Sequence, residues 1–230
     1  MLNWLVLKNI VSAAIFAGLL SGLLLTGAQE LKVNPLILQA EVYEDMALQS
    51  KHAGDADAHH HTHDHAWQPA AGSERKLYTL LANISLAIGF ALLLGAAICL
   101  HGKINAYTGL LWGLAGYTVF FLAPALGLPP DVPGAETAPL VDRQFWWLLT
   151  VVMTASGLVI LVFMHSLKFK LLGLIMLGIP HLIGAPHPEV AASAAPQELA
   201  QAFVYATSFA NALFWLALGG LMGIFYKKST

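Results

Sequence analysis

The sequence predicts an all-α integral membrane protein with about six transmembrane helices. Of its 230 residues, 57% are hydrophobic and only 10% are charged, whereas a soluble domain carries about 25% charged residues. The apolar residues fall into separate runs, and about 20 such residues cross the hydrocarbon core as a helix. The single cysteine, Cys99, excludes an intramolecular disulfide. We therefore expect one membrane domain over residues 1–230.

The first apolar run, Leu5–Ala28, predicts the first transmembrane helix. Its Ala14, Gly18 and Gly22 lie four residues apart, a spacing of small residues that lets another helix approach closely. A secretory signal peptide is the alternative, since the run ends in the small residues Thr26-Gly27-Ala28. Cleavage there would leave one helix fewer.

A polar stretch, residues 29–76, follows and is predicted to be a long external loop rich in histidine. Within it, Pro35–Gln49 carries Glu41, Glu44 and Asp45 at helical spacing. This pattern is typical of a short amphipathic helix on the membrane surface. Residues 52–72 offer little to bury, so we expect disorder there without metal.

Four further apolar runs predict the helices Leu77–Leu100, Ile104–Leu126, Phe145–His165 and Leu199–Tyr226. Residues 127–144 contain four prolines and three acidic residues, so they are expected outside the bilayer. The remaining run begins near Leu171 and is interrupted by prolines at 180, 186 and 188. It forms either the fifth of six transmembrane helices or a re-entrant segment.

The charges separate cleanly between the two sides of a six-helix topology. One side holds no acidic residue and has Lys8, Lys103, Lys168, Lys170, Lys227 and Lys228. The other side holds all 13 acidic residues. Because basic residues favour the cytoplasmic side, both termini are predicted in the cytoplasm. The protein is then multi-pass, with the histidine-rich loop on the external side of the membrane.

The run DADAHHHTHDH predicts a metal-collecting site. Imidazole nitrogens and carboxylate oxygens are ligands of borderline divalent metals. The candidate ligands are His52, Asp55, Asp57, His59, His60, His61, His63, Asp64 and His65, with Glu41 and Glu44 as weaker additions. The alternative is a solvated low-complexity loop without a ligand.

Two other groups of candidate metal ligands lie in or near the helices. His181, His187 and Glu189 surround the proline-broken end of the fifth run. Irregular backbone at membrane depth is tolerated where it lines a cavity, so this group is the predicted transport site. His181 as an interfacial histidine bonded to a neighbouring helix is the alternative. His101 and His165 end two helices, where the helix dipole favours a cation. Capping of the helix end is therefore the first interpretation, and a metal exit site is the second.

Several functions are excluded or disfavoured by the motifs. The sequence has no GxxxxGK[ST], HExxH or GxSxG motif, so we predict that it is not an enzyme and binds no ATP. Its basic residues are too scattered for nucleic acid. No prosthetic group is predicted, although an anchor for haem or quinone would remain if His101 and His165 faced each other.

The chain resembles the CbtA family of cobalt transporters, which are bacterial membrane proteins. The resemblance rests on PLILQAEVYE after the first helix, the histidine-rich loop, GLPPDVPGAE followed by RQFWW, and LGIPHLIGAPHPE. It implies cobalt uptake connected with cobalamin synthesis. It also implies a bacterial inner membrane as the location, with the histidine-rich loop periplasmic or extracellular. It also implies a small partner subunit with a single membrane span and its own histidines.

We therefore expect a membrane permease subunit for divalent transition-metal uptake, with cobalt as the first choice and nickel or zinc as alternatives. Ligand chemistry does not select cobalt, because such sites generally bind nickel, copper and zinc at least as well. The competing hypothesis is a membrane metal sensor or metal-storage module that transports nothing. Besides the partner subunit, the lipid bilayer is the expected environment of the chain.

Overall fold

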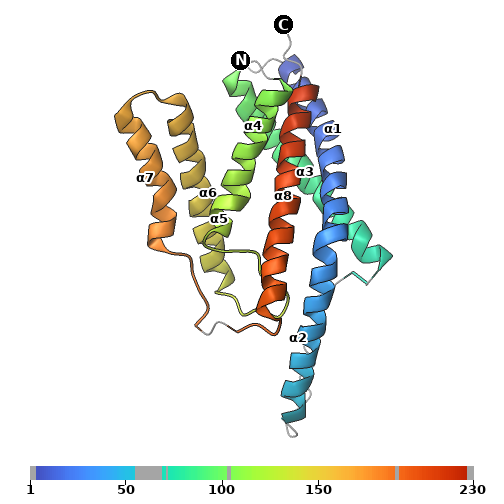
Figure 1. Cartoon of the computed structure of the whole chain (residues 1–230). Helices are drawn as coiled ribbons and strands as arrows, with labels where there is room; N and C mark the ends of the chain where they lie inside the picture. Colours follow the sequence, from blue (N-terminus) through green and yellow to red (C-terminus); the bar gives the residue numbers. More distant parts are fainter. Residues whose placement is uncertain (1–3, 55–68, 71, 103–104, 190–191, 227–230) are drawn as a thin grey trace.

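The computed structural model describes residues 4–54, 69–70, 72–102, 105–189 and 192–226. Within these residues the chain is helical and contains no β-strand, only one isolated β-bridge. This confirms the predicted all-α membrane protein (Figure 1). The elements are α1 (Trp4–Ala28), the π-helix η1 (Gln29–Val33), α2 (Asn34–Gly54), α3 (Ser73–His101), α4 (Ala106–Tyr117), the π-helix η2 (Thr118–Leu122), α5 (Ala123–Ala125), α6 (Leu140–Phe163), α7 (Leu167–Ile183) and α8 (Gln197–Phe225).

Among the described residues, five helices are long and apolar enough to cross a membrane. They are Trp4–Ser50, Ser73–Leu100, Ala106–Ala125, Leu140–Phe163 and Gln197–Phe225. The remaining apolar run is α7, whose 17 residues span about 25 Å, somewhat less than the ~30 Å hydrocarbon core. The start of α1 and the end of α8 lie at the same end of the molecule (Figure 1). The chain path therefore agrees with six apolar runs, of which the fifth is short.

The helix predicted for Pro35–Gln49 exists, but it is not a separate surface helix. It is part of α2, which follows η1 and α1 without a break and projects beyond the other helices (Figure 1). Residues 29–54 are thus helical rather than part of a loop. The prediction was wrong because a proline usually marks a helix boundary, whereas here the π-helix η1 ends two residues before Pro35 and the chain continues as a helix. η2 ends two residues before Pro124 in the same way.

Closely packed glycines join the helices in pairs. α1 packs on α3, and a Cβ added at Gly22 would lie only 2.8 Å from the Cα of Ile84. α4 packs on α8, where a Cβ at Gly109 would lie 2.9 Å from the Cα of Gly223. α6 packs on α7 in a separate hairpin, which meets the other helices through η2 and α5. The small-residue spacing predicted for the first helix is therefore a real contact surface.

An aromatic cluster connects the hairpin to the other helices. The rings of Phe120 and Trp215 are stacked with centroids 5.5 Å apart. Phe90 of α3 lies 4.8 Å from Trp215 and 4.9 Å from Phe120. Trp147 of α6 approaches Phe120 with a centroid distance of 6.4 Å. Four segments of the chain thus meet at one apolar contact.

The segments 127–139 and 184–196 pair with each other at the end of the molecule from which α2 projects (Figure 1). Ala135 and Ser193 form the isolated β-bridge, and the Glu136 amide donates to the Ala192 carbonyl at 2.9 Å. Gly134 adopts φ = 76°, a conformation that glycine accepts at little cost. We call these two segments, without residues 190 and 191, the cap.

Candidate functional site

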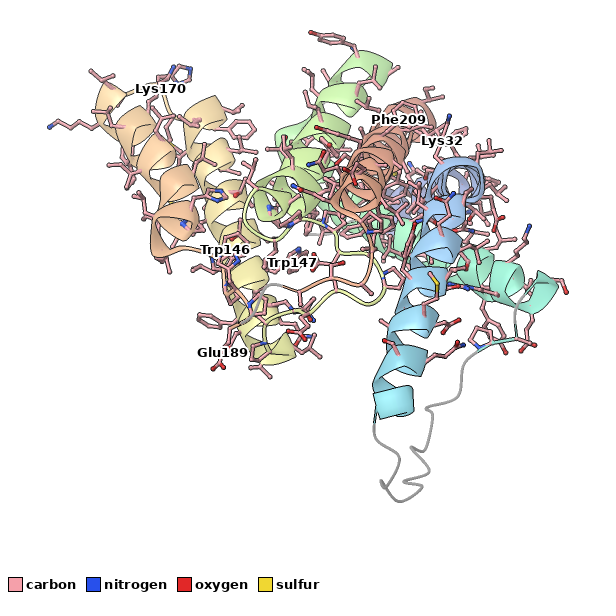
Figure 2. The ribbon with its side chains drawn as sticks, turned by 60° about the horizontal axis from the view of Figure 1, so that its bottom comes forward. Lys32, Trp146, Trp147, Lys170, Glu189 and Phe209 are labelled. Atoms are coloured by element: carbon pink, nitrogen blue, oxygen red, sulfur yellow. The ribbon has the colours of Figure 1, made fainter. Side chains whose placement is uncertain are left out.

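The cap end is the acidic end of the described structure. Glu189 in the cap and Lys170 near the start of α7 lie at opposite ends of the α6–α7 hairpin (Figure 2). Lys8 and Lys168 also lie near the end that carries Trp4 and Phe225. The separation of charge predicted from the sequence is therefore present in three dimensions for these residues.

α2 carries the start of the histidine-rich run away from the other helices. The helix has 21 residues and ends at Gly54, so it extends about 31 Å from Asn34. The run begins at the next residue. Its predicted ligands, Asp55, Asp57, His59, His60, His61, His63, Asp64 and His65, lie outside the described residues, as does the side chain of His52.

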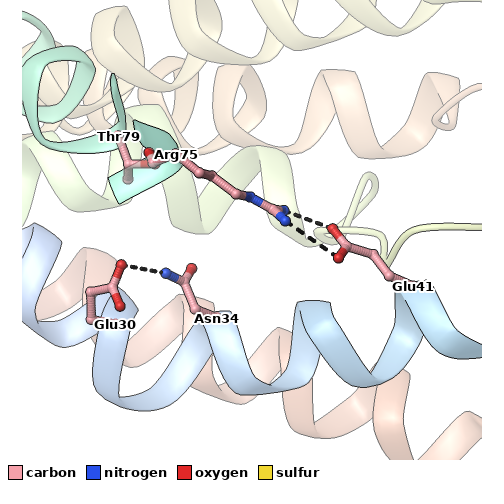
Figure 3. A network of polar contacts seen from close by, with 5 residues as sticks. All are labelled: Glu30, Asn34, Glu41, Arg75 and Thr79. Atoms are coloured by element: carbon pink, nitrogen blue, oxygen red, sulfur yellow. Dashed lines mark hydrogen bonds and ion pairs between the residues drawn. The ribbon is translucent and has the colours of Figure 1, made fainter. Parts of the chain in front are cut away.

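Polar contacts join η1 and the first half of α2 to the start of α3 (Figure 3). The Arg75 guanidinium donates two hydrogen bonds to the Glu41 carboxylate, at 2.7 and 3.3 Å. Glu30 pairs with Lys76 at 3.1 Å and accepts a hydrogen bond from Asn34 at 2.8 Å. A metal ion at Glu41 would thus have to compete with Arg75.

Glu44, the other weaker candidate, lies against the cap. A Cβ at Gly134 would be 3.1 Å from the Glu44 Cβ and 3.3 Å from the Ala194 Cβ. α2 and both segments of the cap therefore meet at Gly134. This contact was not predictable from the sequence, because the three segments lie far apart in the chain.

A second polar network lies deeper, between α1, η1 and α3. The Asn83 amide donates to the Thr26 hydroxyl at 3.0 Å and to the Gln29 side-chain carbonyl at 2.7 Å. Thr26 in turn donates to the Gly22 carbonyl at 2.9 Å. This network was not predicted from the sequence. The available signal was a carboxamide within an apolar run, since polar side chains are costly inside a membrane.

His181 lies near the end of α7 with its side chain exposed, and its ring meets that of Trp146 edge-on at 6.0 Å. The indole of Trp146 donates to the Pro180 carbonyl at 3.2 Å. The ring of His181 therefore contacts a neighbouring helix, while the hydrogen bond between these two helices is made by Trp146. His187 and Glu189 are exposed in the nonhelical segment that follows.

The structure does not bring the predicted transport ligands together. Among the residues that it describes, no three histidine, cysteine, aspartate or glutamate side chains are grouped so that they could hold a metal ion. His165 is exposed and follows the end of α6 at Phe163, two residues beyond the helix that it was expected to end. The side chain of His101 lies outside the described part of the chain.

Asp131 and Arg143 border a pocket of about 610 Å³ between the cap and the start of α6. Desolvation raises the pKa of the Asp131 carboxyl, while the positive charge of Arg143 partly opposes this rise. The Nε of Arg143 is buried and has no hydrogen-bond partner. No sequence pattern indicated this pair, because the two residues face each other only through the fold of the cap.

Comparison with known proteins identifies the family. The family described as "Probable cobalt transporter subunit (CbtA)" matches residues 7–227, nearly the whole chain. No match was found among the curated proteins or among the solved structures. With its apolar helices and a match of this extent, the chain belongs to the CbtA family of probable cobalt transporter subunits.

Proposed function

We propose that this chain is the membrane permease subunit through which a divalent transition metal, cobalt first, enters the cell. The observation that carries the proposal is the family match over residues 7–227 of a chain with five helices able to cross a membrane. The metal is cargo rather than a prosthetic group. Nickel and zinc are competing cargoes, because imidazole and carboxylate ligands bind them at least as well. The chain itself catalyses no covalent chemistry.

The cap and α2 face the periplasm or the exterior in this proposal, and the protein lies in the bacterial inner membrane. The separation of Lys168 and Lys170 from the acidic cap supports this orientation, because basic residues favour the cytoplasmic side. Both termini are then cytoplasmic. A metal ion arriving from outside meets the negative potential of the acidic end first.

The histidine-rich run from Asp55 to His65, with His52, is the proposed collecting site. α2 supports this role because it ends directly before the run, at a distance from the other helices. Many interchangeable imidazole and carboxylate ligands capture an ion weakly and release it readily. Glu44, on the helix that leads to the run, lies against Gly134 of the cap, where it adds negative charge.

His181, His187 and Glu189 are the proposed next ligands. All three belong to the end of α7 and the following segment, on the cap side of the hairpin. Their exposed side chains are accessible to an ion that the run releases. Since the described residues do not group them, coordination requires movement of the nonhelical segment 184–189 toward α7. His101 and His165 are weaker candidates for release on the inner side.

A second protein completes the transporter, because the family is one of subunits. We propose a small partner with a single membrane span and its own histidines. Such a partner supplies ligands that the described part of this chain does not group. The helices would then contact this partner as well as the lipid bilayer.

Uptake of radioactive cobalt and nickel tests the proposal. Cells that express the chain with its partner are compared with cells that lack the chain. Replacing the five histidines between residues 59 and 65 by glutamine should raise the metal concentration for half-maximal uptake by about tenfold, with maximal uptake retained, because the run raises the local concentration of the ion. A matched variant changes Asp55, Asp57 and Asp64 to asparagine and should have a smaller effect. Equal cobalt uptake with and without the chain would defeat the transport proposal.

A membrane metal sensor or storage module is the second candidate. It is favoured by one observation, namely that the described residues hold no group of three metal ligands. The histidine-to-glutamine variant separates the two candidates. A permease keeps uptake at high metal concentration, whereas a sensor or storage module transports nothing and loses its metal response.

A further inference from the structure

An apolar groove of about 820 Å³ separates α6 from α3, α4 and α8. It exists because the α6–α7 hairpin meets the other helices through η2 and α5, so that α6 and α4 diverge beyond this contact (Figure 1). Toward the cap the groove ends at Phe120 and Trp215, which are stacked at 5.5 Å. At the other end it reaches Leu100 and Phe163, near the ends of α3 and α6.

Three helices line the groove with stripes at helical spacing. α3 contributes Leu93, Ala97 and Leu100; α4 contributes Thr108, Leu111 and Ala115; α6 contributes Ala155, Leu158 and Val162. Residues three and four apart lie on the same face of a helix, so each stripe is a continuous surface. Each stripe includes an alanine, and small residues of this kind let another helix approach closely.

The two threonines that line the groove make hydrogen bonds within the chain. The Thr108 hydroxyl and amide bond with Asn105 in a capping box, and the Thr118 hydroxyl donates to the Leu114 carbonyl at 2.9 Å. The donor of the Thr118 hydroxyl and the amide of Thr108 therefore already have partners in the protein. The other residues that line the groove are glycine or carry aliphatic or aromatic side chains. In a bilayer the occupant must therefore be apolar and must satisfy its own backbone hydrogen bonds, as a helix does.

We propose that this groove binds the transmembrane helix of the partner subunit. The family description makes the chain one subunit of a larger transporter, and the groove offers a single helix three walls that the described helices of this chain do not fill. The α4 stripe from Thr108 to Val119 is about 16 Å long, roughly half of the ~30 Å core. The partner helix would thus pack in the half of the membrane away from the cap. This inference rests on the partnership proposed above.

Neighbouring alanines of α3 provide a matched test. Ala97 lines the groove, whereas Ala96 is exposed and lies outside it. Ala97→Phe places a ring in the groove and should reduce co-purification of the co-expressed, tagged partner by at least about tenfold, a loss of ~1.4 kcal/mol. Ala96→Phe should leave co-purification unchanged. Both variants should elute from gel filtration as the parent does, since the groove holds no side chain that the ring would displace.

Disulfide cross-linking gives a second readout that does not depend on a bulky substitution. In a Cys99→Ala background, Ala155→Cys is combined with single cysteines along the span of the partner, and Ala96→Cys is the control. Cross-links from Ala155→Cys should recur every three to four residues of the partner, as expected for one helix face. Ala96→Cys should give none.

The outcomes separate failure of the groove from failure of transport. Any of three results would overturn the groove as the partner site. They are cross-links between two copies of this chain, equal cross-linking from Ala96→Cys, and co-purification that persists in Ala97→Phe without cross-links. Failure of the partner to co-purify with the parent chain would overturn it as well, leaving lipid as the occupant. Specific cross-links without cobalt uptake would support the groove and contradict the proposed cargo.

Discussion

Gly22 lies where α1 approaches the backbone of α3 closely. A Cβ there would lie 2.8 Å from the Ile84 Cα, so the backbones must separate to admit even a methyl group. Gly22→Ala should lower the free energy of unfolding by about 1–3 kcal/mol, the usual cost of overpacking. The check is thermal unfolding in detergent.

Gly27 on the same helix is the control for this prediction. A Cβ at Gly27 would meet nothing within 4 Å, and alanine favours a helix over glycine by up to about 1 kcal/mol. Gly27→Ala should therefore leave the unfolding temperature unchanged or raise it. Equal destabilisation of both variants would show that α1 and α3 do not pack through this surface.

Asp131 makes a prediction about pH. Burial raises the pKa of its carboxyl above the ordinary value of 3.8, with Arg143 opposing the rise. A carboxyl with a raised pKa binds its proton more tightly in the folded state, so its ionisation costs stability as pH rises from about 3.8 through the folded pKa. Asp131→Asn should therefore gain stability relative to the parent between pH 3.5 and pH 7.

Unfolding temperatures of Asp131→Asn and the parent at these two pH values provide the measurement. The effect should be small, because Asp131 is only partly desolvated and its side chain still reaches solvent. Thr137→Ala, an exposed change in the cap that removes no titratable group, is the control and should differ from the parent equally at both pH values. A relative loss of stability for Asp131→Asn toward neutral pH would mean that the attraction to Arg143 dominates instead.

An indole hydrogen bond joins α6 to α7, in addition to the close contact between Gly157 and Gly173. The Trp146 indole donates to the Pro180 carbonyl at 3.2 Å, and Trp146 is buried. Trp146→Phe keeps an aromatic ring but removes the donor, so it should cost about 0.5–1.5 kcal/mol. Trp147→Phe should cost less, because Trp147 is 38% exposed. Unfolding temperatures that rank the two variants in the opposite order would contradict this role.

The ion pair that holds α2 on α3 should contribute little to stability. The side chains of Arg75 and Glu41 are 43% and 35% exposed, so water and salt screen their attraction. A double-mutant cycle with Glu41→Gln and Arg75→Gln should give a coupling energy of about 0.2–1 kcal/mol, decreasing with salt. A much larger coupling energy that does not change with salt would mean that another molecule covers the Arg75–Glu41 pair and shields it from solvent.

At the scale of the whole molecule, the proposed orientation predicts which residues are accessible from each side. Thr137 lies in the cap and Ser166 lies in the turn between α6 and α7, and both are exposed. In a Cys99→Ala background, a membrane-impermeant maleimide applied to intact spheroplasts should label Thr137→Cys but not Ser166→Cys. Permeabilised membranes should label both. Labelling of Ser166→Cys alone in intact spheroplasts would place the cap in the cytoplasm.

The sequence predicted the elements well where the signal is local. The apolar runs predicted α1, α3, α4, α6, α7 and α8, and the four-residue spacing of Gly18 and Gly22 marked a close helix contact that the structure confirms. The continuation of α1 into α2 was missed, because a π-turn before Pro35 depends on backbone geometry that composition does not encode. The predicted ligands in the histidine-rich run stay a prediction.

Hydropathy and charge, read from the sequence alone, determined that this chain crosses a membrane and which of its ends is acidic, because the bilayer selects for apolar length and for basic residues on one side. Only the tertiary structure decided which helices pair. It placed Gly109 against Gly223, Glu44 against Gly134, and α6 apart from α4. These contacts join segments far apart in the chain, and their close packing depends on the shapes of both partners at once. The groove proposed for the partner helix is a consequence of that packing.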